Sequence, residues 1–192
     1  MENLSDAELK RIVDEVVTSL TREMPSRIAV PAAKDPKPAS APQPLGAKSI
    51  AIGADHGGFQ LKEILKRFLE EKGYQVIDCG TNSSESVDYP DFAAAVAEQV
   101  AGGTAWRGIM IDGAGIGSCI AANKVPGIRA AMCYDHATAH NSREHNNANL
   151  LTLGAGMIGS NLAKQITATF IETEFGGGRH ARRVDKIMAI ES

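Results

Sequence analysis

The stretch from Gly108 to Arg129 constrains the fold of this chain more than any other part of its sequence. A short apolar run over 109–111 ends at a carboxylate, Asp112. Three glycines then occupy alternate positions, Gly113, Gly115 and Gly117. A helix-compatible segment begins at Cys119. Glycine lets the backbone come close to a ligand, and N–H groups at the start of a helix point toward negative charge. The stretch therefore predicts a strand, an anion-binding turn and a helix in succession.

Apolar runs and helical patterns alternate along the chain from Ser49 onward. Five short apolar runs predict strands over residues 49–53, 74–78, 108–111, 128–133 and 149–153. Helical patterns fall between them, with clear examples over 61–69, 92–100 and 161–172. Repeated strand–helix units form a parallel sheet with helices on both faces. We therefore expect an α/β domain over residues 49–192.

The N-terminal region has a different pattern. Ser5 and Glu8 have the spacing of a capping box, and one apolar stripe follows at helical intervals: Leu9, Ile12, Val13, Val16, Val17 and Leu20. Six of the eight prolines fall between residues 25 and 44, which predicts an extended linker. We expect an amphipathic helix over 1–24 and a Pro/Ala-rich linker over 25–48. A lone helix of this length is marginal in water, so its stripe needs a partner surface, either on this chain or on another protein.

Composition excludes several classes of function. The net charge of −3 and the pI of about 6.0 argue against a nucleic-acid or anionic-membrane partner. Three widely spaced cysteines match neither a zinc site nor a secreted disulfide framework. No apolar run approaches the roughly 20 residues of a membrane span, and no secretory signal pattern begins the chain. We therefore expect a cytoplasmic protein.

Polar and charged residues follow the predicted strands. The polar residues after the first, third and fourth strands are Asp55, His56, Asp112, His145 and Asn146. A Gly-rich, Arg-rich segment near the C-terminus adds Arg179, His180 and Arg183. Ligands of parallel sheets bind at the carboxyl ends of the strands. We expect these groups to meet at one edge of the sheet. Together they suit an anionic, polyhydroxylated ligand.

Five ordered motifs resemble the type B ribose-5-phosphate isomerase family, which includes the galactose-6-phosphate isomerase subunits. They are GADHGGFQLKE (53–63), the Ser86–Pro90 segment, GAGIGSCIAANKVPGIRAA (113–131), SREHNNANLLTLG (142–154) and EFGGGRHARRV (174–184). The resemblance implies a Rossmann-like five-stranded parallel sheet and a homodimer or homotetramer with active sites across a subunit interface. It also implies aldose–ketose isomerisation of a phosphorylated sugar, most simply ribose 5-phosphate, without metal or organic cofactor.

The same resemblance implies a role for each matching residue. His145 would open the sugar ring, and Asp55 would assist at the sugar hydroxyls. Asn146 and the amides of Gly113–Gly117 would stabilise the enediolate. The remaining matches would bind substrate, mainly its phosphate and sugar hydroxyls: His56, Tyr89, Ser118, Arg179, His180 and Arg183.

Four positions depart from the family pattern. Asp112 stands where many members have a cysteine base, and Ser118 stands where another branch has a glutamate. Ala114 and Gly156 replace a hydroxyl residue and an arginine. Cys119 lies one residue beyond Ser118, the position of the glutamate, and should point in a different direction. We therefore do not expect Cys119 to act as the cysteine base. The hypothesis is that Asp112 is the base of the isomerisation.

The departures leave other functions open. One is an isomerase of a six-carbon sugar phosphate, of the allose or galactose 6-phosphate type. Another is a sugar-phosphate-binding protein without catalysis. The N-terminal helix and linker resemble the encapsulation peptides that dock enzymes inside bacterial microcompartments, so we expect residues 1–24 to bind shell or cargo proteins. The alternative is a helix that mediates oligomerisation.

Overall fold

A computed structural model of the protein describes residues 48–191 and three positions nearer the N-terminus, 7, 10 and 15. These three residues are helical. The rest of the predicted N-terminal helix and its linker lie outside the described residues. The chain divides into two units after residue 43, and the second unit contains the sheet and the helices that cover it.

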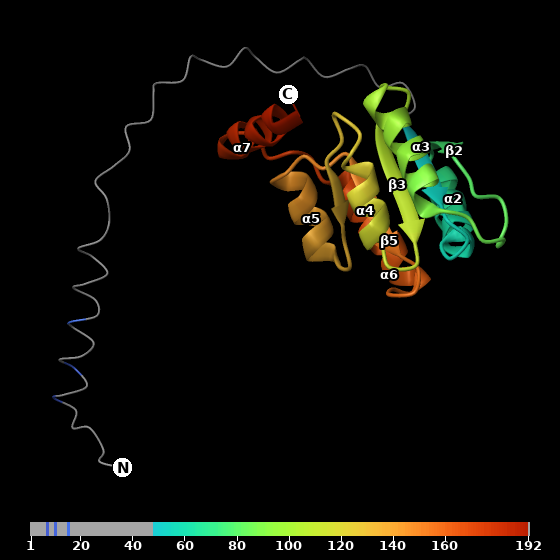
Figure 1. Ribbon diagram of the computed structural model, residues 1–192, viewed down its shortest axis with the longest axis horizontal. Coiled ribbons are helices and arrows are strands. Elements are labelled where there is room, and N and C mark those ends of the chain that lie inside the picture. Colours follow the sequence, from blue (N-terminus) through green and yellow to red (C-terminus); the bar gives the residue numbers. More distant parts are fainter. Residues whose placement is uncertain (1–6, 8–9, 11–14, 16–47, 192) are drawn as a thin grey trace. The chain divides into compact units, whose positions relative to one another are not determined.

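Five strands form one sheet in the order β2-β1-β3-β5-β4 (Figure 1). Every neighbouring pair is parallel. The bounds of the strands are β1 (Ser49–Ala54), β2 (Gln75–Asp78), β3 (Arg107–Asp112), β4 (Ala130–Met132) and β5 (Leu150–Gly154). The predicted five-stranded parallel sheet is therefore confirmed, although β4 is shorter than its apolar run of 128–133.

Helices cover both faces of this sheet. Their bounds are α2 (Phe59–Glu71), α3 (Tyr89–Ala101), α4 (Ile116–Ala122), α5 (His136–Glu144), α6 (Ser160–Glu172) and α7 (Arg179–Met188), with a 3₁₀ turn at Ala189–Glu191. Leu65 of α2, Ala139 of α5 and Phe170 of α6 belong to the core on one face. Val96 of α3 and Ala122 of α4 belong to the core on the other.

The central strands supply both cores because successive side chains point to opposite faces. Ile109 and Ile111 of β3 join the core under α2 and α6, whereas Met110 between them joins the core under α3. All three are fully buried. Burial on both faces explains why this strand is a continuous apolar run in the sequence.

Helix α7 is the one described helix that was not predicted from the sequence. It is rich in charge, and Val184 is its single buried residue. Its apolar residues Val184, Ile187 and Met188 nevertheless recur at helical intervals, so the signal was present. No described helix is both long enough and apolar enough to span a membrane.

Candidate active site

The first group of predicted site residues lies at the carboxyl ends of β1 and β3 and at the starts of α3 and α4. We call it the strand-end cluster, and its members are Asp55, His56, Tyr89, Asp112, Gly113, Gly115, Gly117 and Ser118. β1 and β3 are hydrogen-bonded neighbours in the sheet, so the residues that follow them lie side by side. The backbone N–H of Asp55 donates to the carbonyl of Ile111, 3.1 Å away, and joins the two strand ends directly.

Asp112 is surrounded by donors of its own turn. Its Oδ1 accepts hydrogen bonds from the N–H groups of Ala114, at 2.8 Å, and of Gly115. Its Oδ2 accepts from the N–H of Ser118 at 3.0 Å and from the Ser118 hydroxyl at 2.5 Å. Asp112 and Ser118 are both buried. This carboxylate therefore holds the glycine turn together from the inside.

The network changes what the turn can offer to a ligand. The amides of Ala114 and Gly115, which were expected to support an enediolate, already donate to Asp112. Within residues 48–191, no hydrogen bond occupies the N–H of Gly113. A Cβ added to Gly113 would meet no atom within 4 Å, so the space beside this residue is open. The turn therefore keeps a free donor at its first glycine, and the N–H groups of Ile116 and Gly117 likewise have no hydrogen-bond partner among the described residues.

Asp55 lies near Gly113, on the other side of Gly57. A Cβ added to Gly57 would lie 3.4 Å from Oδ1 of Asp55 and 3.7 Å from the nitrogen of Gly113. Asp55 is 8 % exposed, and its Oδ1 accepts from the N–H of Gly58 at 2.9 Å. No described residue donates to its Oδ2. A carboxylate oxygen and a free backbone N–H therefore adjoin one small space.

Tyr89, the first residue of α3, and His56, in the turn after β1, border this region. The ring of Tyr89 lies against Gly117, where an added Cβ would fall 2.6–2.8 Å from three of its atoms. The Nδ1 of His56 lies 3.3 Å from both the nitrogen and the oxygen of Val87. Both side chains are exposed, and Tyr89 is 39 % exposed.

The second group of predicted site residues forms where α5 ends and α7 begins. We call it the imidazole–arginine cluster, and its members are His145, Asn146, Arg179, His180 and Arg183. The rings of His145 and His180 stack with centroids 4.2 Å apart and an interplanar angle of 6°. Asn141 and Glu144, neither of which was singled out as a site residue from the sequence, hold His145: Nδ2 of Asn141 lies 2.8 Å from its Nδ1, and Oε2 of Glu144 lies 3.3 Å from its Nε2. The spacing of Asn141 and His145, i and i+4 on one helix, was the available signal.

Arg143 fixes the turn that carries His145 and Asn146. Its guanidinium donates to Oδ1 of Asn147 at 3.0 Å and to the carbonyl of Ala148. Asn147 has a positive φ of 48°, a conformation that asparagine adopts more readily than most residues. Burial lowers the pKa of Arg143 to about 10, and the group remains charged at neutral pH.

The two clusters lie at opposite ends of the strands: the strand-end cluster at the carboxyl ends, the imidazole–arginine cluster at the amino ends. The expectation that all predicted site residues meet at one end of the sheet is therefore wrong. Helix α5 begins after the carboxyl end of β4 and carries the chain back, so His145 precedes β5. Asp112 pairs with Gly154 at the far end of β5. The five residues of β5 span about 16 Å at the usual rise of a strand. In Figure 1, α7 lies at the end of the sheet opposite the arrowhead of β3.

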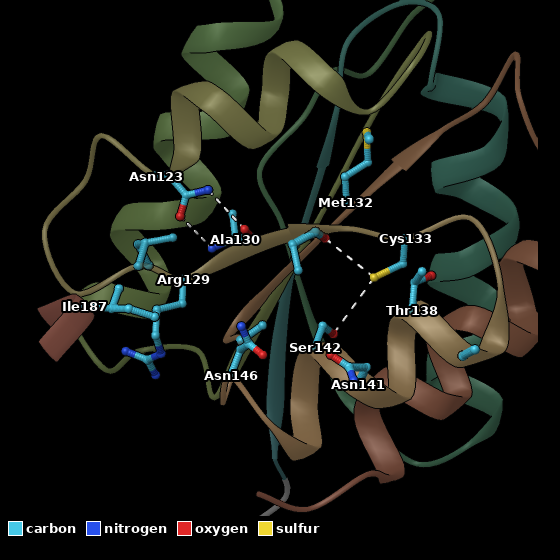
Figure 2. A pocket seen from close by; sticks show the side chains of 14 residues that line it. Asn123, Arg129, Ala130, Met132, Cys133, Thr138, Asn141, Ser142, Asn146 and Ile187 are labelled. Atoms are coloured by element: carbon cyan, nitrogen blue, oxygen red, sulfur yellow. Dashed lines mark hydrogen bonds between the residues drawn. The ribbon is translucent and has the colours of Figure 1, made fainter. Parts of the chain in front are cut away.

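A cavity of about 580 Å³ follows β4, the edge strand of the sheet, between α4 and α5. Figure 2 shows Asn123 and Arg129 on one side, Cys133 and Thr138 on the other, and Asn146 at its lower end. The side chain of Asn123 bonds both the N–H and the carbonyl of Ala130. This edge is therefore capped against pairing with another strand.

No cysteine reaches the strand-end cluster. The thiol of Cys119 points to the carbonyl of Ala130, 3.4 Å away, so it does not take the cysteine role at the glycine turn. Burial raises the pKa of Cys133 to about 11 and also raises the pKa of Cys79. Within the described part of the chain, no three His, Cys, Asp or Glu side chains are placed to hold a metal ion.

Comparison with known proteins gives consistent matches over the sheet domain. The model of the family described as "Ribose/Galactose Isomerase" matches residues 50–187. Ribose-5-phosphate isomerase B of Escherichia coli K12 is 49 % identical over 144 residues, which are 75 % of this chain and 97 % of the relative. A solved ribose-5-phosphate isomerase B from Clostridium thermocellum has 56 % identity and a TM-score of 0.74, covering 74 % of this chain and 97 % of its own. The ribose-5-phosphate isomerase B of Mycoplasma genitalium, solved with bound ribulose-5-phosphate, has 41 % identity and a TM-score of 0.73. The match covers 76 % of this chain and 97 % of that one.

Proposed function

The chain belongs to the ribose/galactose isomerase family, and from this premise we propose that it interconverts ribose 5-phosphate and ribulose 5-phosphate. It is a sugar-phosphate isomerase. The observation that supports the five-carbon substrate is its 49 % identity across nearly the whole of a ribose-5-phosphate isomerase B. The replacements at Ala114 and Gly156 keep a six-carbon sugar phosphate as the second candidate.

A coupled assay of ketose formation tests this proposal. Ribose 5-phosphate, allose 6-phosphate and galactose 6-phosphate are compared by kcat/KM with the full-length protein. We expect the highest value with ribose 5-phosphate. A higher value with either six-carbon substrate would assign the second function. Binding of all three without turnover would identify a non-catalytic sugar-phosphate-binding protein.

The proposed roles of the site residues follow the two clusters. His145 opens the ring, and Asn146 stabilises the enediolate together with the free amide of Gly113. Arg179 and Arg183, with His56, bind the phosphate as charge-assisted donors, and His180 lies beside them. Tyr89 lines the sugar pocket. The chemistry is carried by these side chains and by backbone amides, without a cofactor.

We propose that two copies of the chain complete each site. Enediolate stabilisation and phosphate binding, as assigned above, each need groups from both clusters, yet about one strand length separates the clusters in a single chain. Ile116 and Ile120 of α4 are 51 % and 59 % exposed beside the glycine turn. Their one-turn spacing supports a contact between copies that brings the strand-end cluster of one to the imidazole–arginine cluster of its partner.

Mixing two inactive variants tests the shared site. Asp55→Asn removes a group from one cluster, and His145→Gln removes a group from the other. A heterodimer of the two contains one site with both clusters intact. Random mixing by reversible unfolding should therefore restore about a quarter of wild-type activity. A mixture as inactive as its two components would show that each site lies within one chain.

We propose further that residues 1–24 direct the enzyme into a bacterial microcompartment. The support is the capped amphipathic pattern of 5–22 followed by six prolines within 25–44. Fusion of residues 1–47 to a fluorescent protein should give puncta in cells that assemble shells, whereas diffuse fluorescence would contradict the proposal. Truncation at Lys48 with loss of the oligomer would instead support an oligomerisation helix.

A further inference from the structure

The two buried carboxylates of the strand-end cluster differ in what their oxygens are free to do. We propose that Asp55 is the base that removes the carbon-bound proton, and that Asp112 is a positioning residue that holds the glycine turn. This inference rests on the isomerase function proposed above. It moves the base from the position that the sequence hypothesis selected to the end of the neighbouring strand.

Asp112 has no oxygen to spare for a substrate. Four donors surround it, two at each oxygen: the amides of Ala114 and Gly115 at Oδ1, and the amide and hydroxyl of Ser118 at Oδ2. Taking up a proton would require one of these buried donors to lose its partner, which costs about 1–3 kcal/mol for each unsatisfied group. The same bonds fix the path of residues 113–118, so the carboxylate has a structural task that proton transfer would interrupt.

Asp55 has the opposite arrangement. One backbone N–H, that of Gly58, holds its Oδ1 at 2.9 Å and fixes the orientation of the carboxylate. No described residue donates to its Oδ2. Among the described residues the one buried side-chain oxygen or nitrogen without a partner is the hydroxyl of Thr167, so Oδ2 of Asp55 is accessible. Burial of the rest of the side chain, which is 8 % exposed, keeps this oxygen in a fixed position.

The free amide of Gly113 supplies the second component of the reaction. A Cβ added to Gly57 would lie 3.4 Å from Oδ1 of Asp55 and 3.7 Å from the nitrogen of Gly113, so glycine at this position leaves the carboxylate and the donor as neighbours. A base and an oxyanion donor that face one carbon and its carbonyl oxygen are the two groups that enolisation requires. The Asp112 network holds this donor in place by fixing the turn that begins at Gly113.

The proton transfer balances without another reactant. Asp55 takes the proton from C2 of the open-chain aldose, and the electrons of the C–H bond form the C1–C2 double bond while the carbonyl oxygen becomes an enediolate oxygen beside Gly113. The hydroxyl proton on the C2 oxygen passes to the C1 oxygen. Protonated Asp55 then returns its proton to C1, which gives the ketose and regenerates the carboxylate.

Solvent hydrogen exchange separates this role from ring opening. Ribulose 5-phosphate is an open-chain ketose, because its phosphorylated C5 oxygen cannot close a furanose ring. Exchange of its C1 hydrogen with deuterium oxide, followed by NMR, therefore needs the base but not ring opening. We expect Asp55→Asn to slow this exchange at least about 10²-fold in the full-length enzyme. Glu98→Gln, which removes an exposed carboxylate on α3, is the charge-matched control and should exchange as wild type.

Two further variants keep the test decisive. Added formate should restore exchange to Asp55→Ala, since a small carboxylate can fill the vacated space, and a structural defect would not respond in this way. Asp112→Asn should lower the Tm but keep the wild-type pH dependence of the exchange rate, because its base is intact. Exchange in Asp55→Asn within tenfold of wild type would overturn the inference. So would an Asp112→Asn enzyme, and no other variant, whose exchange rate no longer falls as the pH is lowered. Absence of exchange in the wild-type enzyme would overturn the proposed function as well.

Discussion

The imidazole ring of His180 lies parallel to that of His145, with centroids 4.2 Å apart and planes inclined by 6°. Two rings in this arrangement cannot both carry a proton at low cost, because like charges at short range disfavour the charged form. Partial desolvation, followed by the neighbouring His145, Arg179 and Arg183, lowers the pKa of His180 below its ordinary value. His180 is therefore neutral in the folded protein over a range in which the unfolded chain is already protonated.

This difference predicts a pH dependence of stability. Since the folded pKa is the lower one, the unfolded chain binds more protons as the pH falls through about 6.5, and stability is lost in that range. The Tm of wild type should drop between pH 7.5 and pH 5.5 by more than the Tm of His180→Gln. The variant His136→Gln, which removes an exposed imidazole from α5, should drop as much as wild type. Equal losses in wild type and His180→Gln would exclude this role.

Two glycines, Gly58 beside the strand-end cluster and Gly117 within it, predict opposite outcomes for the same substitution. A Cβ on Gly58 would lie against the carbonyl of Ile111, 2.7 Å from its carbon, whereas a Cβ on Gly117 would meet the ring of Tyr89. The strand backbone cannot move, but a side chain that is 39 % exposed can. Gly58→Ala should cost about 3 kcal/mol of unfolding free energy or prevent folding.

For Gly117→Ala the expected effect is on substrate binding. Its unfolding free energy should stay within about 1 kcal/mol of wild type, while displacement of Tyr89 raises the KM for the sugar phosphate. Gly159→Ala is the control, because an added Cβ there meets nothing within 4 Å. Denaturant unfolding and steady-state kinetics measure the two effects. A Gly117→Ala enzyme with a large stability loss and unchanged KM would contradict the proposed contact of Tyr89 with the sugar.

The sheet could be predicted from the sequence because its strands are buried on both faces. Ile109, Met110 and Ile111 form one apolar run since alternate side chains enter two different cores. Helix α7 differs, because only Val184 along it is buried. Val184, Ile187 and Met188 recur at helical intervals, so this helix could have been found from its periodicity rather than from a continuous apolar run.

The separation of the two clusters was available from topology but not from the motifs. A helix between parallel strands returns the chain to the amino edge, so residues directly before β5 had to lie there. The occupation of the Ala114 and Gly115 amides could not be foreseen, because it depends on the rotamer of Asp112 and on the buried hydroxyl of Ser118. A pattern of residue types marks where such groups meet, but it does not assign their hydrogen bonds.

A buried lysine predicts how the protein responds to acid. The Nζ of Lys62, whose side chain is fully buried, donates to Oδ1 of Asp78 at 2.7 Å, and Lys66 donates to Oδ2 at 2.8 Å. Burial by itself would raise the pKa of Asp78, yet these hydrogen bonds hold it below the ordinary value of 3.8. The resulting stability is fully present above that value and is lost as the pH falls below it through the lower folded pKa.

Asp78→Asn should remove this acid dependence and destabilise the protein at neutral pH. After this substitution the buried ammonium of Lys62 keeps one carboxylate partner, Glu63, 3.2 Å away. We therefore expect the free energy of unfolding to fall by roughly 3 kcal/mol. Lys66→Gln removes a partner that is 31 % exposed and should cost less than about 1 kcal/mol. Urea unfolding at pH 7 and at pH 3.5 gives both comparisons. Parallel pH dependence in wild type and Asp78→Asn would exclude this carboxylate as the source.

Arg107, the first residue of β3, holds the carboxyl end of α6. Its guanidinium donates to the carbonyls of Phe170 and Ile171, at 2.6 Å for the second, and to that of Thr173 at 3.3 Å. A helix leaves its last carbonyls without partners, and here one buried cation satisfies two of them and the carbonyl of the capping residue, while the helix dipole favours its charge. Burial, and then the nearby Arg143, lowers the pKa of Arg107 to about 9, so it stays protonated at neutral pH.

Arg107→Met should therefore cost more than the loss of an ordinary surface cation. It keeps the apolar stem but leaves buried carbonyls unpaired, so we expect roughly 2–4 kcal/mol of lost unfolding free energy. Arg67→Met is the matched control, because Arg67 donates only within its own helix, to the carbonyl of Glu63, on an exposed surface. Its effect should stay within about 0.5 kcal/mol. Similar losses in the two variants would mean that water or backbone adjustment satisfies the end of α6, and that Arg107 does not anchor this helix to the sheet.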